Sequence, residues 1–560
     1  MKRHVVLAQV LLAAVFLFLF LPQGGRAAPE LPPEGWTGIY SRSDLESIPL
    51  KPDGQYILMN DIDLTGKAWP GLCSEDLPFS GVLDGNDHSI YGMTAENASS
   101  SACGLFNYLC GGRVKNLSLS GSSSGPLAGL LCGKISQGEI SDCAVRGTVT
   151  ASQWGGGVVG QISGEDVTVE NCTAVCTVTG SSSGEDEIFL GGIAGGAYGA
   201  DIRIASCESS GTLSFSGVAA SVGGTVGVFD GAGILSDCGS ESALSLSLSA
   251  GGCLGGIVGR GGRNSLSIDG CSFRADWTVS CASADLRAGG IVGLLSSCGD
   301  CAVRDCVSFG SLFVTAACAS VGGIVGDQIA ETENSSVLRC SSFLRLSAVA
   351  DPLYVGGICG TNRGELGTAT VENCHADGSI TLSGALNGDP SRFSGGICGF
   401  NGGTGASVLS LCFSSCDVFA ECPLADGAAV GMSAPFSETG TVSVTQCYYR
   451  AGLREGFASP VSGDQLSDPA SYIGFDFQQI WRMDASFGIP FLRSAEISSS
   501  QPLAGDTDGN GRLTAYDARL LMQYLTSRVT LTDGQKSRGD INGDGVLNAT
   551  DVSLILRGVS

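Results

Sequence analysis

The 560-residue sequence has little positive charge. Its 30 lysines and arginines stand against 55 aspartates and glutamates, a formal net charge of −25. Nucleic-acid binding needs a basic face that neutralises phosphates, so nucleic acid is excluded as a partner. Only 15% of the residues are charged whereas 43% are hydrophobic, and this balance excludes an intrinsically disordered chain.

Histidine is also scarce, with three residues in the chain. His4 lies in a basic N-terminal segment, and His88 and His375 are far apart in the sequence. A Ser-His-Asp triad or a zinc protease site is therefore not expected. The Cys-Gly-Asp-Cys sequence at 298–301 has no second pair at zinc spacing, which favours a local disulfide or free thiols there.

Long apolar runs are confined to the N-terminus. Lys2, Arg3 and His4 precede an apolar run over 5–21, and small residues follow at Ala27 and Ala28. This order predicts a signal peptide over 1–28 and a secreted, extracellular protein. Because about 17 apolar residues is the lower limit for spanning a bilayer, an uncleaved anchor is the alternative, and a membrane location depends on it.

Glycine is in excess, at 85 of 560 residues, without the Gly-X-Y period of collagen. Many glycines belong to a repeated Gly-Gly-X-X-Gly sequence, whose last glycines are residues 160, 195, 227, 259, 293, 326, 360 and 399. A sustained spacing of 32 to 39 residues is typical of a solenoid. Each copy also has three short β-branched segments and no helical period, which predicts one coil of a parallel β-helix.

Each copy places a cysteine three residues after an apolar residue. Residues three apart face opposite sides of a straight strand, so the chain turns a corner if both point inward. The residue before the cysteine often tolerates a left-handed conformation, as at Asp142, Asn171, Asp237, Gly270, Asp305 and Asn373. The apolar residues are Ile140, Val169, Ile204, Leu235, Ile268, Val303, Val337, Val371, Leu409 and Val444.

Ten of the 24 cysteines occupy this corner position: Cys143, Cys172, Cys207, Cys238, Cys271, Cys306, Cys340, Cys374, Cys412 and Cys447. Stacked coils lie about 4.8 Å apart. The sequence therefore predicts an interior column of small, soft hydrophobic side chains. A disulfide framework, common in exported cysteine-rich proteins, is the alternative.

The Gly-Gly-Ile-Val-Gly … Asn-Cys … Gly pattern resembles the GLUG-repeat proteins. The resemblance implies a mainly β protein, a right-handed parallel β-helix of GLUG-like repeats over 101–448. Similar flanking segments imply an N-terminal cap over 29–100 and an aromatic-rich C-terminal cap over 449–493, followed by a linker over 494–503. Caps at both ends would cover the open sheet edges of the solenoid.

Two copies of one twelve-residue loop lie near the C-terminus, at 506–517 and 540–551. Oxygen donors at loop positions 1, 3, 5, 9 and 12, a carbonyl at 7 and glycine at 6 have the spacing of a calcium loop. The first loop provides Asp506, Asp508, Asn510, Arg512 (carbonyl), Thr514 and Asp517, and the second Asp540, Asn542, Asp544, Val546 (carbonyl), Asn548 and Asp551. Two in-phase copies predict two Ca²⁺ ions.

A helix is expected after each loop, from Asp517 to about Ser527 and from Asp551 to about Arg557. Because no helix is expected before Asp506, the loop–helix pairs resemble a type I dockerin, a small all-α domain, over 504–560. That resemblance implies docking to a cohesin module of a scaffolding protein or cell surface, as in cellulosomes. The partner contacts it implies are Ala515, Tyr516, Met522, Gln523, Ala549 and Thr550.

The sequence therefore favours a secreted docking protein whose β-helix binds a polysaccharide or another surface. The alternative is a polysaccharide lyase or glycoside hydrolase on the β-helix, which needs acids and basic residues on adjacent coils. The catalytic candidates beside the corner cysteines are Asp305, Arg339 and Glu372. Salt-bridged surface is the other interpretation of these three residues.

Overall fold

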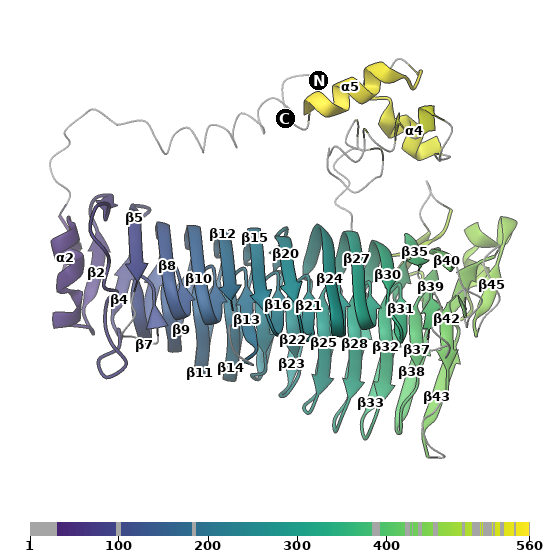
Figure 1. Ribbon diagram of the computed structural model, residues 1–560, viewed down its shortest axis with the longest axis horizontal. Coiled ribbons are helices and arrows are strands. Elements are labelled where there is room, and N and C mark those ends of the chain that lie inside the picture. Colours follow the sequence, from purple (N-terminus) through teal and green to yellow (C-terminus); the bar gives the residue numbers. More distant parts are fainter. Residues whose placement is uncertain are drawn as a thin grey trace.

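The computed structural model shows a long parallel β-solenoid (Figure 1). The structure describes residues 31–96, 102–181, 186–383, 392–420, 426–427, 429–434, 439–451, 457–483 and 488–494, and then residues 505, 507, 518, 521–522, 524–526, 531, 533–542 and 545–558. The signal peptide predicted over 1–28 lies outside these residues. Among the described residues, no helix has the length and apolar character needed to cross a bilayer.

One coil illustrates the repeat. Strand β10 (Ala144–Gly156) leads into the Gly-Gly-X-X-Gly turn, β11 (Val159–Glu170) leads away from it, and Cys172 closes the coil. Strand β10 pairs in parallel with β8 (Ser118–Gly129) of the preceding coil and β12 (Thr173–Ser181) of the next. The predicted parallel solenoid is confirmed, and its right hand stays a prediction.

The strands of the solenoid belong to two long parallel sheets. The sheet that follows the glycine turns, called sheet A, contains β1 (Thr37–Ile39), β2 (Gln55–Leu58), β4 (Val82–Asp84), β7 (Phe106–Lys115), β9 (Cys132–Ser141), β11, β14 (Ala194–Ala205), β17 (Val226–Phe229), β18 (Gly233–Ser236), β22 (Val258–Gly261), β23 (Leu266–Asp269), β25 (Val292–Ser297), β26 (Cys301–Arg304), β28 (Val325–Ala330), β29 (Ser335–Leu338), β32 (Cys359–Gly364), β33 (Thr368–Glu372), β37 (Cys398–Asn401), β38 (Ala406–Ser410), β42 (Val430–Ser433) and β43 (Thr441–Thr445).

The sheet that leads into the turns, called sheet B, contains β3 (Ile62–Asp63), β5 (Ser89–Glu96), β6 (Ala102–Cys103), β8, β10, β12, β13 (Ile188–Gly191), β15 (Glu208–Gly217), β16 (Ala220–Gly223), β19 (Gly239–Ser240), β20 (Ala243–Leu248), β21 (Gly252–Gly255), β24 (Ser272–Gly289), β27 (Val307–Gly322), β30 (Ser341–Val349), β31 (Leu353–Gly356), β34 (His375–Ala376), β35 (Ser379–Leu382), β36 (Arg392–Gly395), β39 (Phe413–Ser414), β40 (Asp417–Ala420), β41 (Asp426–Gly427), β44 (Tyr448–Arg450) and β45 (Ser459–Val461).

The corner predicted before each cysteine is confirmed. All ten corner cysteines are buried, and the apolar residue three positions earlier is buried in nine coils and half-buried at Val444. The residue directly before each corner cysteine has φ between 51° and 64°. These residues are Asp142, Asn171, Ser206, Asp237, Gly270, Asp305, Arg339, Asn373, Leu411 and Gln446. Residue type alone did not predict this conformation at Ser206, Arg339, Leu411 and Gln446.

The corner cysteines form a column of free thiols, as predicted, and no disulfide occurs among the cysteines that the structure describes. Each thiol donates to backbone carbonyls at the corner. The Cys306 thiol, for example, lies 3.6 Å from the Ile268 carbonyl of the preceding coil and 3.1 Å from the Arg304 carbonyl. The weak donor is therefore satisfied without a disulfide partner.

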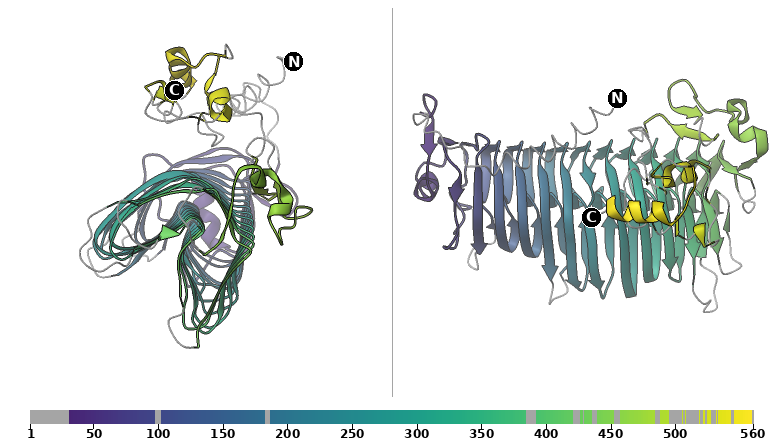
Figure 2. Two further views of the ribbon diagram at one scale, coloured as in Figure 1. Left: turned by 90° about the vertical axis from the view of Figure 1, so that its right-hand side faces the viewer. Right: turned by 90° about the horizontal axis from the view of Figure 1, so that it is seen from above.

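The glycine turns lie close to the chain that follows the corner cysteine, on the opposite side of the coil. A Cβ placed on Gly224 would collide with the Gly256 carbonyl of the next coil and with the Ser240 side chain, and one on Gly290 with the Gly323 carbonyl and the Ser308 side chain. Only glycine leaves room for both the next coil and the opposite wall. Viewed along the axis, the coils form two lobes (Figure 2, left).

Helix α2 (Arg42–Ser47) and the 3₁₀ turn η1 (Ile48–Leu50) lie at the N-terminal end of the solenoid (Figure 1). Ser41 caps α2 by accepting a hydrogen bond from the Asp44 amide. Leu45 and Ile48 are fully buried in the hydrophobic core that continues through the coils as far as Tyr449. The first coil is thereby covered.

The chain after the last coil packs beside the solenoid. It contains η2 (Gly463–Ser467), η3 (Pro469–Ser471) and an antiparallel pair, β46 (Trp481–Met483) and β47 (Pro490–Leu492). Strand β45 extends sheet B by pairing with β44. Tyr472, Phe475, Trp481 and Phe491 form one buried cluster with Phe413 and Tyr448 of the coils. This segment, 459–494, is called the C-terminal strap.

The C-terminal module contains helices α4 (Asp533–Gly539) and α5 (Ala549–Gly558). Helix α5 begins two residues before the predicted Asp551 start. Helix α4 occupies the connector between the two loops. Ala518, Leu521, Leu531, Val552 and Ile555 make a small buried core. Of the helix expected over 517–527, residues 518, 521, 522, 524 and 525 are helical and residue 526 is a turn, and the other five lie outside the described residues.

Candidate functional site

The second predicted calcium loop lies between α4 and α5. Gly545 at loop position 6 has φ +80°, the left-handed conformation that the sharp turn of a calcium loop requires. The Gly545 amide donates to Asp540 Oδ2 at 2.7 Å, and the Asn548 amide donates to Asp551 Oδ2 at 2.9 Å. The loop is therefore folded around the carboxylates at its two ends.

Asp551 supplies the test of whether a cation fits. Its side chain is fully buried, and its Oδ1 has no hydrogen-bond partner among the described residues. An unpaired buried carboxylate oxygen is costly unless a cation or proton compensates it. The oxygen-only donor set of Asp540, Asn542, Asn548, Asp551 and the Val546 carbonyl suits Ca²⁺. The residues present thus fit the ion.

Other predicted calcium ligands lie outside the described residues: Asp506, Asp508, Asn510, Arg512, Thr514, Asp517 and Asp544. Within the described residues no group of three or more His, Cys, Asp or Glu side chains forms a metal centre. Of the predicted partner contacts, Met522, Ala549 and Thr550 are exposed, whereas Ala515, Tyr516 and Gln523 are not described.

The predicted catalytic candidates lie at the cysteine corner. Arg339 holds Asp305 through two hydrogen bonds, Nε to Oδ1 at 2.9 Å and Nη2 to Oδ2 at 2.6 Å. Glu372 accepts from the Asn373 side chain at 3.1 Å and belongs to a different pair. The C-terminal strap also contacts this surface, because the Ser494 hydroxyl donates to the Arg339 carbonyl at 3.3 Å. These contacts match the salt-bridged-surface interpretation.

A different set of side chains flanks the glycine turns. Two positions flank each Gly-Gly-X-X-Gly turn: one lies two residues before its first glycine, and the other directly follows its last glycine. Strand pairing places the residues at the first position above one another in successive coils, and so forms one column of side chains. The residues at the second position form another column. The sheet B column contains Trp154, Phe189, Ser221, Cys253, Arg287, Ser320, Tyr354 and Phe393, and the sheet A column Gln161, Gly196, Val228, Arg260, Leu294, Asp327, Thr361 and Phe400. These are called the two flanking columns.

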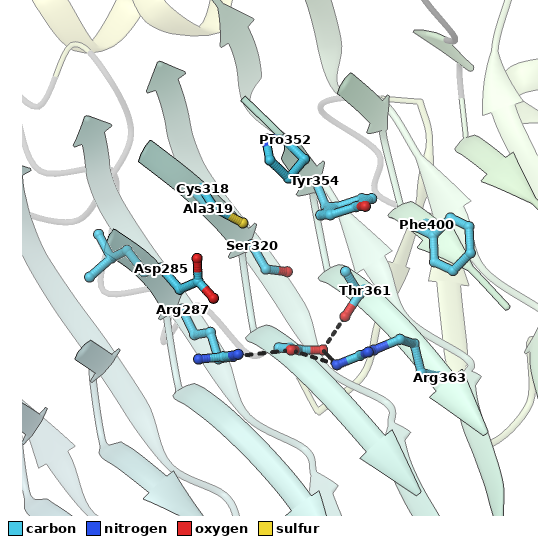
Figure 3. Close-up of a pocket in the computed structure, with 12 residues that line it drawn as sticks. Asp285, Arg287, Cys318, Ala319, Ser320, Pro352, Tyr354, Thr361, Arg363 and Phe400 are labelled. Atoms are coloured by element: carbon cyan, nitrogen blue, oxygen red, sulfur yellow. Dashed lines mark hydrogen bonds and ion pairs between the residues drawn. The ribbon is translucent and has the colours of Figure 1, made fainter. Parts of the chain in front are cut away.

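A pocket of about 220 Å³ lies between the flanking columns (Figure 3). Arg287, Ser320 and Tyr354 line it from sheet B, and Asp327, Thr361 and Phe400 line it from sheet A. Asp285, Leu286, Cys318, Ala319, Pro352 and Arg363 complete the lining. Both columns therefore contribute side chains to a single cavity.

Asp327 is the polar centre of the pocket. Arg287 Nε lies 3.2 Å and Arg363 Nη2 3.0 Å from its Oδ2, and the Thr361 hydroxyl donates to its Oδ1 (Figure 3). Its side chain is 6% exposed, so the two guanidinium groups compensate a carboxylate that is almost removed from water. Mutual pairing fixes the orientation of both arginines.

Tyr354 and Phe400 form the aromatic side of the pocket. Their rings meet edge to face at 5.8 Å, and Tyr354 stacks on Phe393 of the next coil at 5.7 Å. Burial raises the pKa of the Tyr354 hydroxyl, which therefore stays protonated and able to donate at neutral pH.

A second aromatic cluster lies further toward the N-terminus along the same columns. Trp154 stacks on Phe189 at 4.1 Å and meets Tyr198 edge to face at 4.9 Å. Gly196 in the opposite column leaves the space that the Trp154 ring occupies. Arg260 lies over the Phe189 ring at 5.5 Å and pairs with Glu187 at 2.8 Å.

The pocket residues were not predicted from the sequence. The available signal was the pair of positions flanking each Gly-Gly-X-X-Gly motif. Large or charged residues recur there, as at Arg287, Asp327, Tyr354 and Phe400. Arg363 has no such signal, because it lies two residues beyond the flanking position of its coil, Thr361.

Comparisons with known proteins match both parts of the chain. The family model for the dockerin type I domain matches residues 504–560, and that for the GLUG motif matches residues 351–381. Halomucin of Haloquadratum walsbyi (strain DSM 16790 / HBSQ001) is 29% identical over 171 residues, a match that covers 27% of this chain and 2% of halomucin. The chain thus corresponds to a small fraction of that protein.

A solved structure of a candidate immunoglobulin A1 protease from Bacteroides ovatus also aligns. It covers 82% of this chain and 92% of its own, with 14% sequence identity and a TM-score of 0.27. The family matches and the observed fold agree on the organisation of the chain: a parallel β-solenoid with a GLUG motif is followed by a dockerin type I domain at 504–560.

Proposed function

We propose that this protein is an extracellular docking component. Its calcium-loaded dockerin binds a cohesin module on a scaffold or cell surface, and its solenoid is the cargo that contacts polysaccharide there. The observation that carries the docking half is the dockerin match over 504–560, together with a second loop whose buried Asp551 carboxylate lacks a polar partner among the described residues.

Two Ca²⁺ ions are proposed, one for each loop. In the second loop Asp540, Asn542, Asp544, Asn548, Asp551 and the Val546 carbonyl would hold the ion, and in the first loop the matching six residues from Asp506 to Asp517. Bound Ca²⁺ supplies positive charge among converging carboxylates. Asp551 lies in the first turn of α5, so its fixation also orients the exposed Ala549 and Thr550 for the partner.

Calorimetry of the full chain against a panel of cohesin modules, in calcium and then in chelator, tests docking. We expect binding in calcium only. Thr550→Arg should weaken binding to the cohesin that the wild type prefers, whereas Thr278→Arg on an exposed solenoid strand serves as the matched control. Absence of calcium-dependent binding to every cohesin would overturn the docking proposal.

A further inference from the structure

We propose that the pocket between the flanking columns binds one pyranose ring of an uncharged polysaccharide, whose chain continues along the columns toward Trp154. This inference rests on the cargo half of the proposed function and assigns its site and ligand class. It is independent of cohesin binding, because the pocket lies in the solenoid and the loops lie in the dockerin domain.

The aromatic side of the pocket provides a stacking surface. An aromatic ring has a negative face, to which the C–H groups on one face of a pyranose are attracted. Tyr354 is half-buried and its ring is held by Phe393 and Phe400, so no rotamer freedom has to be lost when a sugar binds. A volume of about 220 Å³ suits a single sugar ring.

The polar side of the pocket provides fixed hydrogen-bond groups. Arg287 and Arg363 are oriented by Asp327, and Ser320 and Thr361 carry hydroxyls on the same lining. A few fixed polar groups beside an aromatic surface are what a small-molecule site uses to set orientation and specificity. Sugar hydroxyls both donate and accept, which matches guanidinium donors beside a carboxylate and two hydroxyls.

Charge favours an uncharged glycan over a polyanionic one. The pocket balances two arginines, Arg287 and Arg363, against two aspartates, Asp285 and Asp327. The chain carries a formal net charge of −25, so its long-range field repels polyuronates and sulfated glycans. No excess positive charge in the pocket lining offsets that repulsion.

The flanking columns give the ligand a path beyond the pocket. Tyr354 and Phe189 are five coils apart in the sheet B column, about 24 Å at the usual strand spacing. Small side chains, Ser221, Cys253 and Ser320, occupy three of the four intervening positions. We infer that a chain of several sugar rings passes the Arg260–Glu187 ion pair, which lies over Phe189, and so contacts both Tyr354 and the Trp154–Phe189 stack.

Calorimetry of the full chain against soluble β-glucan, xylan, mannan and polygalacturonate tests the inference. We expect binding to at least one of the three neutral polymers and none to polygalacturonate. Tyr354→Ala should weaken the binding about tenfold, the loss of roughly one stacking contact. Tyr354→Phe should retain most of the affinity, and Phe313→Ala, at an exposed phenylalanine outside the pocket, should retain all of it.

Binding of oligosaccharides of different length distinguishes the contribution of the pocket from that of the columns beyond it. Trp154→Ala should weaken long chains and leave disaccharides unaffected, whereas Tyr354→Ala should weaken both. Three results would overturn the inference. They are the absence of binding to any of the three neutral polymers, a preference for polygalacturonate, and equal affinities of wild type and Tyr354→Ala. Cohesin binding by the same protein sample reports separately on docking.

Discussion

Trp481 of the C-terminal strap donates its indole N–H to the side-chain oxygen of Asn373, 3.1 Å away and 108 residues earlier in the chain. Asn373 is one of the left-handed corner residues, with φ 53°. The strap is therefore attached to the corner of the solenoid by a buried hydrogen bond as well as by its aromatic cluster.

Removal of that bond should loosen the strap. We expect Trp481→Phe to lower the free energy of unfolding by about 1–3 kcal/mol, because the Asn373 oxygen stays buried without a donor. Limited proteolysis should then cut within 459–494 earlier than in the wild type. Trp36→Phe, at a half-buried tryptophan near the N-terminal end, is the control. Equal cleavage rates for wild type and Trp481→Phe would contradict the role of the bond.

The left-handed corner predicts a stabilising substitution. Ser206 is exposed and has φ 51°, a conformation that costs an L-residue roughly 1–2 kcal/mol and glycine almost nothing. Ser206→Gly should therefore raise the urea midpoint, by about 1 kcal/mol in free energy. Ser214→Gly, within the regular strand β15, should lower it. The same sign of change at both positions would contradict the corner geometry.

The cysteine column predicts the pattern of thiol reactivity. Among the described cysteines Cys298 is exposed, whereas the ten corner cysteines are buried. Ellman's reagent should label Cys298 quickly in the native protein, and Cys298→Ser should remove that fast phase. The corner thiols should react only after unfolding, without added reductant. A deficit of free thiols in the unfolded protein would indicate disulfides and contradict the column.

His375 predicts a dependence of stability on pH. Phe343, Phe413 and Phe491 surround it, neither ring nitrogen has a hydrogen-bond partner among the described residues, and burial lowers its pKa from 6.5 to about 4. The unfolded chain takes up a proton below pH 6.5, while the folded chain does so only near pH 4. Stability is therefore lost as the pH falls between these values.

At pH 5 this loss amounts to about 2 kcal/mol, since one unit of pKa difference corresponds to about 1.4 kcal/mol. His375→Phe should flatten the fall in urea midpoint between pH 7 and pH 5. Phe313→Leu, at an exposed residue that does not titrate, should leave it unchanged. Parallel pH profiles for wild type and His375→Phe would contradict the prediction.

The solenoid was predictable because its signals lie within each repeat. The three-residue separation of Ile140 and Cys143 implies a corner, and the structure has one there. At Arg339 and Leu411 residue type gave no indication of a left-handed conformation. The stacked neighbours impose it there, since hydrogen bonds along the column fix the corner of every coil in the same way.

The pocket was not predictable in the same way. Arg287, Asp327 and Arg363 come from three successive coils and are 36 to 40 residues apart in the pairs that they form. Their meeting depends on strand register, which the repeat spacing alone does not specify. The sequence also did not indicate that the C-terminal strap contacts the side of the solenoid, because aromatic residues alone do not specify which apolar surface they cover.

The absence of side chains at the second glycine of each turn makes the coils interchangeable. The contact is the same from coil to coil, because a backbone carbonyl of the next coil meets the second glycine, as at Gly224 and Gly256. Duplication or loss of a whole coil would change the number of sugar rings that the flanking columns span. It would leave the backbone contacts at the glycine turns unaltered. The number of coils that the gene encodes would then set the length of the glycan that the protein binds.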